Sequence, residues 1–178
     1  MEKTDLPSVR GNIFLVGLMG AGKTTLGREL SRQLGKTFYD ADREIEHRTG
    51  VKIPVIFEIE GEAGFRAREA AVIQDLAQKQ DIVLATGGGA VLLPENRALL
   101  RAHGTVVYLC APLDELFART HRDRTRPLLA TADPRARLGE LLAQRDGLYR
   151  EVDDLVLDTR GHNVPALARE LAQKLARR

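Results

Sequence analysis

The stretch Gly17-Leu18-Met19-Gly20-Ala21-Gly22-Lys23-Thr24 constrains the fold of this chain most, because it fills the pattern G-x-x-x-x-G-K-[ST] at every fixed position. An apolar run rich in strand-forming residues precedes it at residues 12–16, and leucines at helical spacing follow it as far as Leu34. The sequence therefore predicts a strand, a glycine loop and a helix in direct succession. Backbone N–H groups of such a loop and the positive end of the helix together bind a chain of phosphates.

This loop is the first candidate for a nucleotide site. We expect the phosphates of ATP to contact a run of six residues, Gly20, Ala21, Gly22, Lys23, Thr24 and Thr25. Lys23 would bring a positive charge to the β and γ phosphates, and the Thr24 hydroxyl would ligate Mg²⁺. The alternative, a chance glycine turn with a surface lysine, requires the motif and both of its flanks to match by accident.

The composition is that of one ordinary globular unit, and we expect a single domain over residues 1–178. Hydrophobic residues make up 43% of the chain, and the net charge of +2 predicts neither a nucleic-acid partner nor a membrane partner. The single cysteine, Cys110, excludes a disulfide framework and a cysteine metal site. No apolar run reaches the roughly 18 residues of a membrane span, and residues 1–5 lack the layout of a signal peptide. A cytoplasmic monomer is therefore the default expectation.

Two carboxylates follow the second predicted strand, which contains Phe38 and Tyr39. Asp40 and Asp42 would lie at the carboxyl edge of the sheet beside the glycine loop, where open α/β proteins place their ligands. In the alternative interpretation, either aspartate caps a helix that begins near Arg43.

Two helices are predicted next, over residues 53–60 and 62–79, with a break at Gly61. Arg66 lies near the start of the second helix, where a cation opposes the helix dipole. This position suggests that Arg66 binds a negative ligand, although a solvated arginine is the common alternative. We expect the region of about residues 40–68 to bind the substrate.

A predicted strand over residues 81–86 runs directly into Gly87-Gly88-Gly89. Three consecutive glycines lose much conformational entropy on folding, so an ordered triple needs a reason such as positive φ or a close backbone approach to a ligand. A flexible loop is the alternative, and the position of the glycines at the end of a core strand argues against it.

A basic segment follows the strand predicted over residues 105–110 and the helix after it. Within eight residues it contains four arginines, Arg119, Arg122, Arg124 and Arg126. We interpret residues 119–133 as a mobile basic lid that closes over a triphosphate, excludes water and neutralises charge on the transferred group. Nucleic-acid binding is the alternative, and no interleaved aromatic residues support it.

Strands predicted near residues 12, 38, 82, 105 and 154 alternate with helices, which indicates a five-stranded parallel sheet covered on both faces. The later helices are expected over residues 94–103, about 134–148 and 163 or 164 to 175, with the last strand over 152–158. Arg145 lies near the end of the second of these helices.

Several of these motifs, in this order, resemble the shikimate kinase family, and the similarity covers nearly the whole chain from residue 12 to residue 165. It rests on residues 17–24, Asp40-x-Asp42, Gly61 with Phe65-Arg66, Gly87-Gly88-Gly89, Arg126-Pro127-Leu128-Leu129, and Arg145 with Leu148-Tyr149-Arg150. The resemblance implies a three-layer α/β/α P-loop NTPase fold with strand order 2-3-1-4-5. It also implies transfer of the γ-phosphoryl group of ATP to the 3-hydroxyl of shikimate, in the chorismate branch of aromatic amino-acid biosynthesis.

For the acceptor, the resemblance implies shikimate contacts at Asp42, Arg66, Gly87, Gly88, Gly89 and Arg145. Arginines bind a carboxylate through charge-assisted hydrogen bonds, and an ionised Asp42 can orient the acceptor hydroxyl and take its proton. For the nucleotide, it implies that Arg119 stacks on adenine and that Arg126 and Lys23 contact the transferred phosphoryl group. Asp40 would hold Mg²⁺ through water beside the direct ligand Thr24. Lys23, Asp42 and Arg126 are thus the candidate catalytic residues.

Two segments depart from the family's pattern. The family has an arginine or lysine followed by Asn-Pro beside the adenine, whereas residues 159–165 read Thr-Arg-Gly-His-Asn-Val-Pro, with the proline displaced by one position. The extra lid charges Arg122 and Arg124 have no family role to inherit.

Two other functions would use the same ATP machinery. A kinase for gluconate or a nucleoside monophosphate also needs an arginine pair, but the glycine triple with Asp42 and Arg145 favours a compact polyhydroxylated carboxylate. A regulatory module that binds ATP without catalysis is the second alternative, and the presence of Lys23, Thr24 and both aspartates argues against it.

Overall fold

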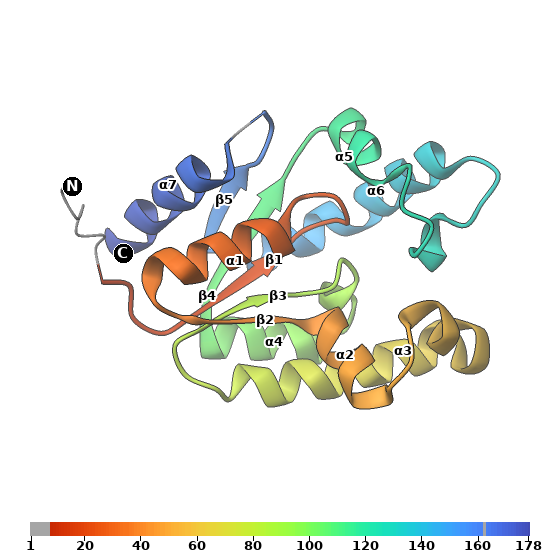
Figure 1. Ribbon diagram of the computed structural model, residues 1–178, viewed down its shortest axis with the longest axis horizontal. Helices are drawn as coiled ribbons and strands as arrows, with labels where there is room; N and C mark the ends of the chain where they lie inside the picture. Colours follow the sequence, from red (N-terminus) through yellow and green to blue (C-terminus); the bar gives the residue numbers. More distant parts are fainter. Residues whose placement is uncertain (1–7, 162) are drawn as a thin grey trace.

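The computed structural model describes residues 8–161 and 163–178, and its centre is a five-stranded sheet (Figure 1). The strands are β1 (Asn12–Val16), β2 (Thr37–Asp40), β3 (Ile82–Ala85), β4 (Gly104–Cys110) and β5 (Leu155–Asp158). Every neighbouring pair is parallel, and the spatial order is β2-β3-β1-β4-β5. The predicted sheet and its strand order are therefore confirmed.

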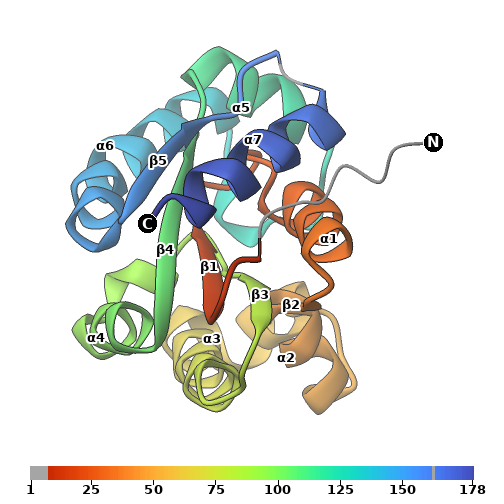
Figure 2. The same ribbon diagram turned by 90° about the vertical axis from the view of Figure 1, so that its left-hand side faces the viewer.

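Helices cover both faces of the sheet, which completes the predicted three layers (Figure 2). In chain order they are α1 (Lys23–Leu34), α2 (Ala41–Thr49), α3 (Ile53–Ala77), α4 (Pro94–His103), α5 (Leu113–Thr120), α6 (Pro134–Val152) and α7 (Val164–Ala176), with short 3-10 turns at Ala90–Leu92 and Pro127–Leu129. Helices α1 and α7 pack together on one face, whereas α3, α4 and α6 lie on the other. No helix among the described residues is long and apolar enough to cross a membrane.

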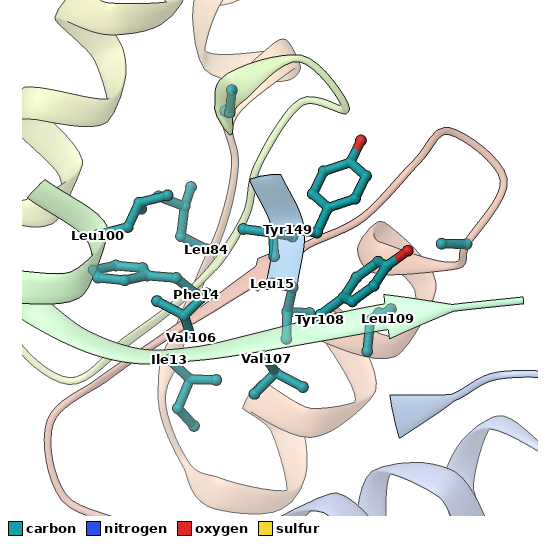
Figure 3. Packing of buried hydrophobic residues seen from close by; sticks show 14 of the residues in the cluster. Ile13, Phe14, Leu15, Leu84, Leu100, Val106, Val107, Tyr108, Leu109 and Tyr149 are labelled. Atoms are coloured by element: carbon teal, nitrogen blue, oxygen red, sulfur yellow. The ribbon is translucent and has the colours of Figure 1, made fainter. Parts of the chain in front are cut away.

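The core lies along the central strand β1, all five residues of which are buried. Parallel strands covered on both faces need apolar side chains on both sides, which accounts for the uninterrupted run from Ile13 to Val16. Around it pack the aromatic rings of Tyr108 and Tyr149, whose centroids are 4.9 Å apart (Figure 3). This stack joins β4 to α6 and brings α6 against the carboxyl edge of the sheet.

Helix α6 is longer than predicted, and the last strand is shorter. The prediction ended the helix at Leu148 and began the strand at Val152, but the helix continues to Val152 and β5 begins at Leu155. The buried residues Leu138, Leu141, Arg145, Tyr149 and Val152 recur at intervals of three or four along α6. One buried helical face therefore extends through Tyr149 to Val152, beyond the predicted end of the helix at Leu148.

The predicted break at Gly61 is confirmed. Gly61 has φ 70° and ψ −177° inside α3, a combination that is essentially restricted to glycine. Two contacts join the halves of the helix across it: the rings of Phe57 and Phe65 lie 4.8 Å apart, and Arg68 donates two hydrogen bonds to Glu60 at 2.6 and 2.8 Å. The break thus has a fixed geometry, which turns the second half of α3 and its Arg66 toward the sheet edge.

A pair of alanine substitutions tests this backbone requirement. Gly61→Ala should lower the free energy of unfolding by about 1–3 kcal/mol, because alanine is strained at this φ and ψ. Gly147→Ala, in the regular part of α6 where an added methyl group meets no atom within 4 Å, should raise it by about 0.5–1 kcal/mol. Urea unfolding at neutral pH measures both, and equal effects in the two variants would contradict the assignment.

Candidate active site

A cavity of about 870 Å³ opens at the carboxyl edge of the sheet. Helices α2 and α3 flank this edge on one side, and the segment after α5 flanks it on the other (Figure 1). The structure brings all but one of the predicted site residues to its lining: Gly20, Gly22, Lys23, Thr24, Thr25, Asp40, Asp42, Arg66, Gly87, Gly88, Gly89, Arg119, Arg126 and Arg145. Ala21 is the exception, since it is buried and its backbone N–H donates to the Leu18 carbonyl at 3.1 Å.

The phosphate loop joins β1 to α1 as predicted. Gly22 caps α1 with φ 96°, a left-handed conformation that leaves the N–H groups of the first helical turn open toward the cavity. The Lys23 ammonium group donates hydrogen bonds to the carbonyls of Gly17 at 2.6 Å and Leu18 at 3.0 Å. Burial, followed by the charge of Arg126, lowers the pKa of Lys23 to about 8.

Asp40 lies beside the first turn of α1. Its Oδ2 accepts a hydrogen bond from the Thr24 hydroxyl at 2.5 Å, and its Oδ1 accepts one from the Arg43 backbone at 3.1 Å, so it caps α2. The capping alternative is therefore confirmed for Asp40, but the same carboxylate also faces the phosphate loop. Because α2 begins at Ala41, Asp42 lies inside its first turn and is not the cap. The adjacent Thr24 and Asp40 oxygens form a donor set that fits Mg²⁺, a cation that binds one or two protein oxygens together with phosphate and water.

Arg66 and Glu69 form a buried ion pair on α3. The Arg66 Nη1 lies 2.9 Å from Glu69 Oε1, and its Nη2 lies 3.2 Å from Glu62 Oε1. The Arg66 side chain is only 12% exposed, so the solvated alternative is wrong. Glu69 is fully buried, and burial raises its pKa. Glu69 is not among the predicted site residues, although its spacing of three residues from Arg66 on a helix is a signal for this contact.

The glycine triple makes room for the protein's own side chains. None of the three glycines has positive φ, which corrects one of the two expected reasons. A Cβ atom at Gly87 would lie 2.4 Å from Glu69 Oε2, and one at Gly89 would lie 2.4 Å from the Arg66 guanidinium group. The Gly88 carbonyl accepts a hydrogen bond from the Tyr149 hydroxyl at 2.5 Å. Close approach is therefore the structural reason for Gly87 and Gly89, with the charged pair Arg66 and Glu69 as the neighbours, whereas a Cβ atom at Gly88 would make only ordinary contacts, at 3.4 Å or more.

Arg145 is the most deeply buried cation of the site. It is 2% exposed, and its Nε and Nη1 have no hydrogen-bond partner within the described part of the chain. Burial lowers its pKa. A desolvated guanidinium group with free N–H donors costs free energy unless a ligand supplies acceptors, so its position at the cavity favours an anionic ligand.

Asp42 lines the same cavity beside Gly87, where an added Cβ atom would lie 3.2 Å from its Oδ1. Its Oδ1 is buried and has no hydrogen-bond partner among the residues that the structure describes. Burial, together with the charges of Glu69 and Asp40, raises the pKa of Asp42 to about 7, while Lys23 and Arg126 oppose the shift. Its carboxyl group is thus poised between the charged and the neutral form near physiological pH.

The lid arginines fall into two groups. Arg119 donates to the Gly20 carbonyl at 3.0 Å and to the Thr159 carbonyl at 2.9 Å, and Arg126 lies 3.0 Å from Asp123. Arg122 and Arg124 are exposed and do not line the cavity. The extent and mobility of the lid stay predictions.

In the predicted adenine-side segment, His162 lies outside the described residues, as do the first five residues of the chain.

Comparisons with known proteins agree with this geometry. A family model described as shikimate kinase matches residues 19–176. A curated relative from Chromobacterium violaceum, named shikimate kinase, is 60% identical over 170 residues, which are 96% of this chain and 92% of the relative. The family match covers the lid and the phosphate loop from Met19 onward.

Solved structures extend the comparison. The shikimate kinase of Acinetobacter baumannii in complex with shikimate has a TM-score of 0.87 and 50% sequence identity, and the match covers 93% of this chain and 90% of that one. A gluconokinase from Sinorhizobium meliloti has a TM-score of 0.62 at 20% identity, over 96% of this chain and 94% of that one. The second likeness shows the fold alone, so the fold is common to kinases with different acceptors.

The raised pKa of Asp42 predicts a pH-dependent effect on stability. The unfolded chain ionises this group near pH 4 but the folded chain only near pH 7, so ionisation makes folding less favourable as the pH rises between these values. Asp42→Asn should therefore be more stable than the wild type at pH 8, by on the order of 2 kcal/mol, and the difference should vanish toward pH 4. Urea unfolding across this range measures it. Asp114→Asn, which changes an exposed carboxylate, is the control, and an Asp42→Asn variant with the same pH profile as the wild type would contradict the assignment.

Proposed function

This chain belongs to the shikimate kinase family, and we propose that it transfers the γ-phosphoryl group of ATP to the 3-hydroxyl of shikimate, giving shikimate 3-phosphate and ADP. The observation that supports the proposal is one cavity whose lining combines a phosphate loop with a separate set of charged side chains. The phosphate loop contributes one part of its lining, and Arg66, Arg145 and Asp42 contribute another. The first part suits a nucleotide, and the second suits a small anionic polyol.

Arg145 and Arg66 account for binding of the acceptor carboxylate. Carboxylate oxygens would satisfy the free N–H donors of Arg145 through charge-assisted hydrogen bonds. Glu69 holds the Arg66 guanidinium group on one side, so its orientation is fixed before the acceptor arrives. The close packing of Gly87 and Gly89 against these side chains keeps the main chain near the ring of the acceptor.

Asp42 is suited to act on the acceptor hydroxyl. Its unpaired Oδ1 can accept a hydrogen bond from that hydroxyl and orient its oxygen toward the phosphate loop. A pKa of about 7 lies near the operating pH, where a general base is most effective. We therefore assign to Asp42 both the orientation of the nucleophile and the removal of its proton.

Lys23 and Arg126 would act on the transferred group. As the phosphoryl group moves in line from ATP to the hydroxyl, charge spreads over its oxygens, and both cations line the cavity where it would pass. Thr24 and Asp40 would hold Mg²⁺, which supplies further neutralisation of the phosphates when bound. No covalent phosphoenzyme is needed. Arg119 would contact the adenine, because it lies between the phosphate loop and Thr159 after the last strand.

The decisive experiment compares acceptors. In a coupled assay for ADP release with Mg²⁺-ATP, shikimate should support turnover at least about 100-fold faster than gluconate or adenylate, since its rigid ring fixes the carboxylate relative to the hydroxyls, whereas gluconate is an open chain and adenylate has a phosphate in place of the carboxylate. Preferred turnover with gluconate or adenylate would indicate one of the other kinases. ATP binding without acceptor-dependent ADP release would indicate a regulatory module.

Two variants separate chemistry from acceptor binding. Asp42→Asn should lower kcat by about 100-fold or more, because the amide cannot take the proton. Arg145→Ala should mainly raise the KM for shikimate, by about tenfold or more, because the carboxylate loses a charged partner. Arg137→Ala, on the same helix at a partly exposed position outside the cavity lining, is the matched control and should change neither constant. Wild-type kinetics in both site variants would remove these assignments.

A further inference from the structure

The four arginines of the lid differ in whether the protein holds them in place. Arg119 and Arg126 line the cavity, and both have partners: Arg119 contacts Glu115, Gly20 and Thr159, and Arg126 contacts Asp123. Arg122 and Arg124 are exposed, and within the described part of the chain neither forms an ion pair. The arginines that face the reaction are therefore the ones whose side chains are fixed.

Asp123 fixes Arg126 through a compact set of contacts. Its Oδ1 accepts hydrogen bonds from the Thr125 backbone N–H at 2.9 Å and from the Thr125 hydroxyl at 2.5 Å. Its Oδ2 lies 3.0 Å from the Arg126 Nε, which makes this contact an ion pair; the buried Nε has no hydrogen-bond partner among the described residues. The ion pair uses the Nε side of the guanidinium group, and the terminal nitrogens Nη1 and Nη2 stay available for phosphoryl oxygens.

A carboxylate at this place needs an explanation. Asp123 itself lines the cavity that is to receive a triphosphate, where a negative charge repels the nucleotide. Burial alone would raise the pKa of Asp123, but the Thr125 donors and the charge of Arg126 lower it on balance, so the carboxylate stays ionised. This repulsion is offset if the carboxylate orients the neighbouring cation, Arg126.

We propose that Asp123 is a positioning residue for the phosphoryl transfer: it holds the Arg126 guanidinium group in the orientation that the transferred group requires. The inference rests on the proposed kinase function. An arginine side chain on a loop has many rotamers, and ordering it costs conformational entropy. If the side chain is already ordered before the reaction, this cost does not add to the activation free energy. The benefit therefore belongs to the transition state, which Arg126 contacts, and not to binding of the acceptor at Arg145 and Arg66.

Asp123→Asn removes the negative charge but keeps an oxygen that can accept the hydrogen bonds from Thr125. The asparagine Oδ1 can still accept from Thr125, but its NH₂ group then faces the Arg126 Nε, donor against donor. We expect kcat to fall about tenfold, while the KM for shikimate changes less than about twofold. Asp114→Asn is the matched control. Asp114, on the neighbouring helix α5, also pairs with an arginine, Arg135, at 2.5 Å, but it lies outside the cavity lining. Its substitution should leave both constants unchanged.

A double-mutant cycle with Arg126→Ala identifies the path of the effect. If Asp123 acts through Arg126, Asp123→Asn should lower kcat less than about twofold when Arg126 is already absent. An equal loss of kcat with and without Arg126, or no loss in the otherwise wild-type chain, would overturn the proposal. Thermal unfolding of each variant confirms that the compared chains are folded. A wild-type chain that released no ADP with shikimate would overturn the proposed function instead, and this inference with it.

Discussion

Parallel pairing of all five strands is the constraint from which the site follows. Since the strands point the same way, the phosphate loop after β1, the aspartates at the end of β2 and the glycines after β3 all lie at one edge. The central place of β1 puts its loop between the acceptor side and the lid side of the cavity. Arg145 joins them from α6, because the stack of Tyr149 on Tyr108 holds that helix against the sheet. The topology alone thus assembles groups that are distant in the sequence.

The second organising principle is the burial of charge before any ligand arrives. Lys23, Asp42, Glu69 and Arg145 are all withdrawn from water, and each has its pKa shifted toward the neutral form by that burial. Such an arrangement is costly to the fold, and its unpaired atoms are those that face the cavity. Ligands with complementary charge then bind to groups already desolvated and oriented, which is the electrostatic preorganisation that phosphoryl transfer needs.

Much of this could be predicted from the sequence, because local patterns determine it. The phosphate loop, the sheet, the break at Gly61 and the bounds of α4 follow from glycine positions and hydrophobic periodicity. Glu69 and Asp123 are absent from the predicted site, because the arginine that each one contacts is determined by the three-dimensional structure. It also ended α6 too early, because the buried face of that helix is created by packing against the sheet. The adenine-side contacts and the lid's motion stay predictions.

The two hydrogen bonds of Lys23 have a consequence for selectivity. Its ammonium group donates to the carbonyls of Gly17 and Leu18, which hold it beside the loop. Any anion that recruits the lysine must compensate for these bonds, and a lone small anion has few further contacts to offer. A polyphosphate chain also meets the helix terminus and several main-chain amides. We therefore expect the loop to bind a polyphosphate chain more tightly than inorganic phosphate, because only the chain contacts the lysine, the helix terminus and the main-chain amides together.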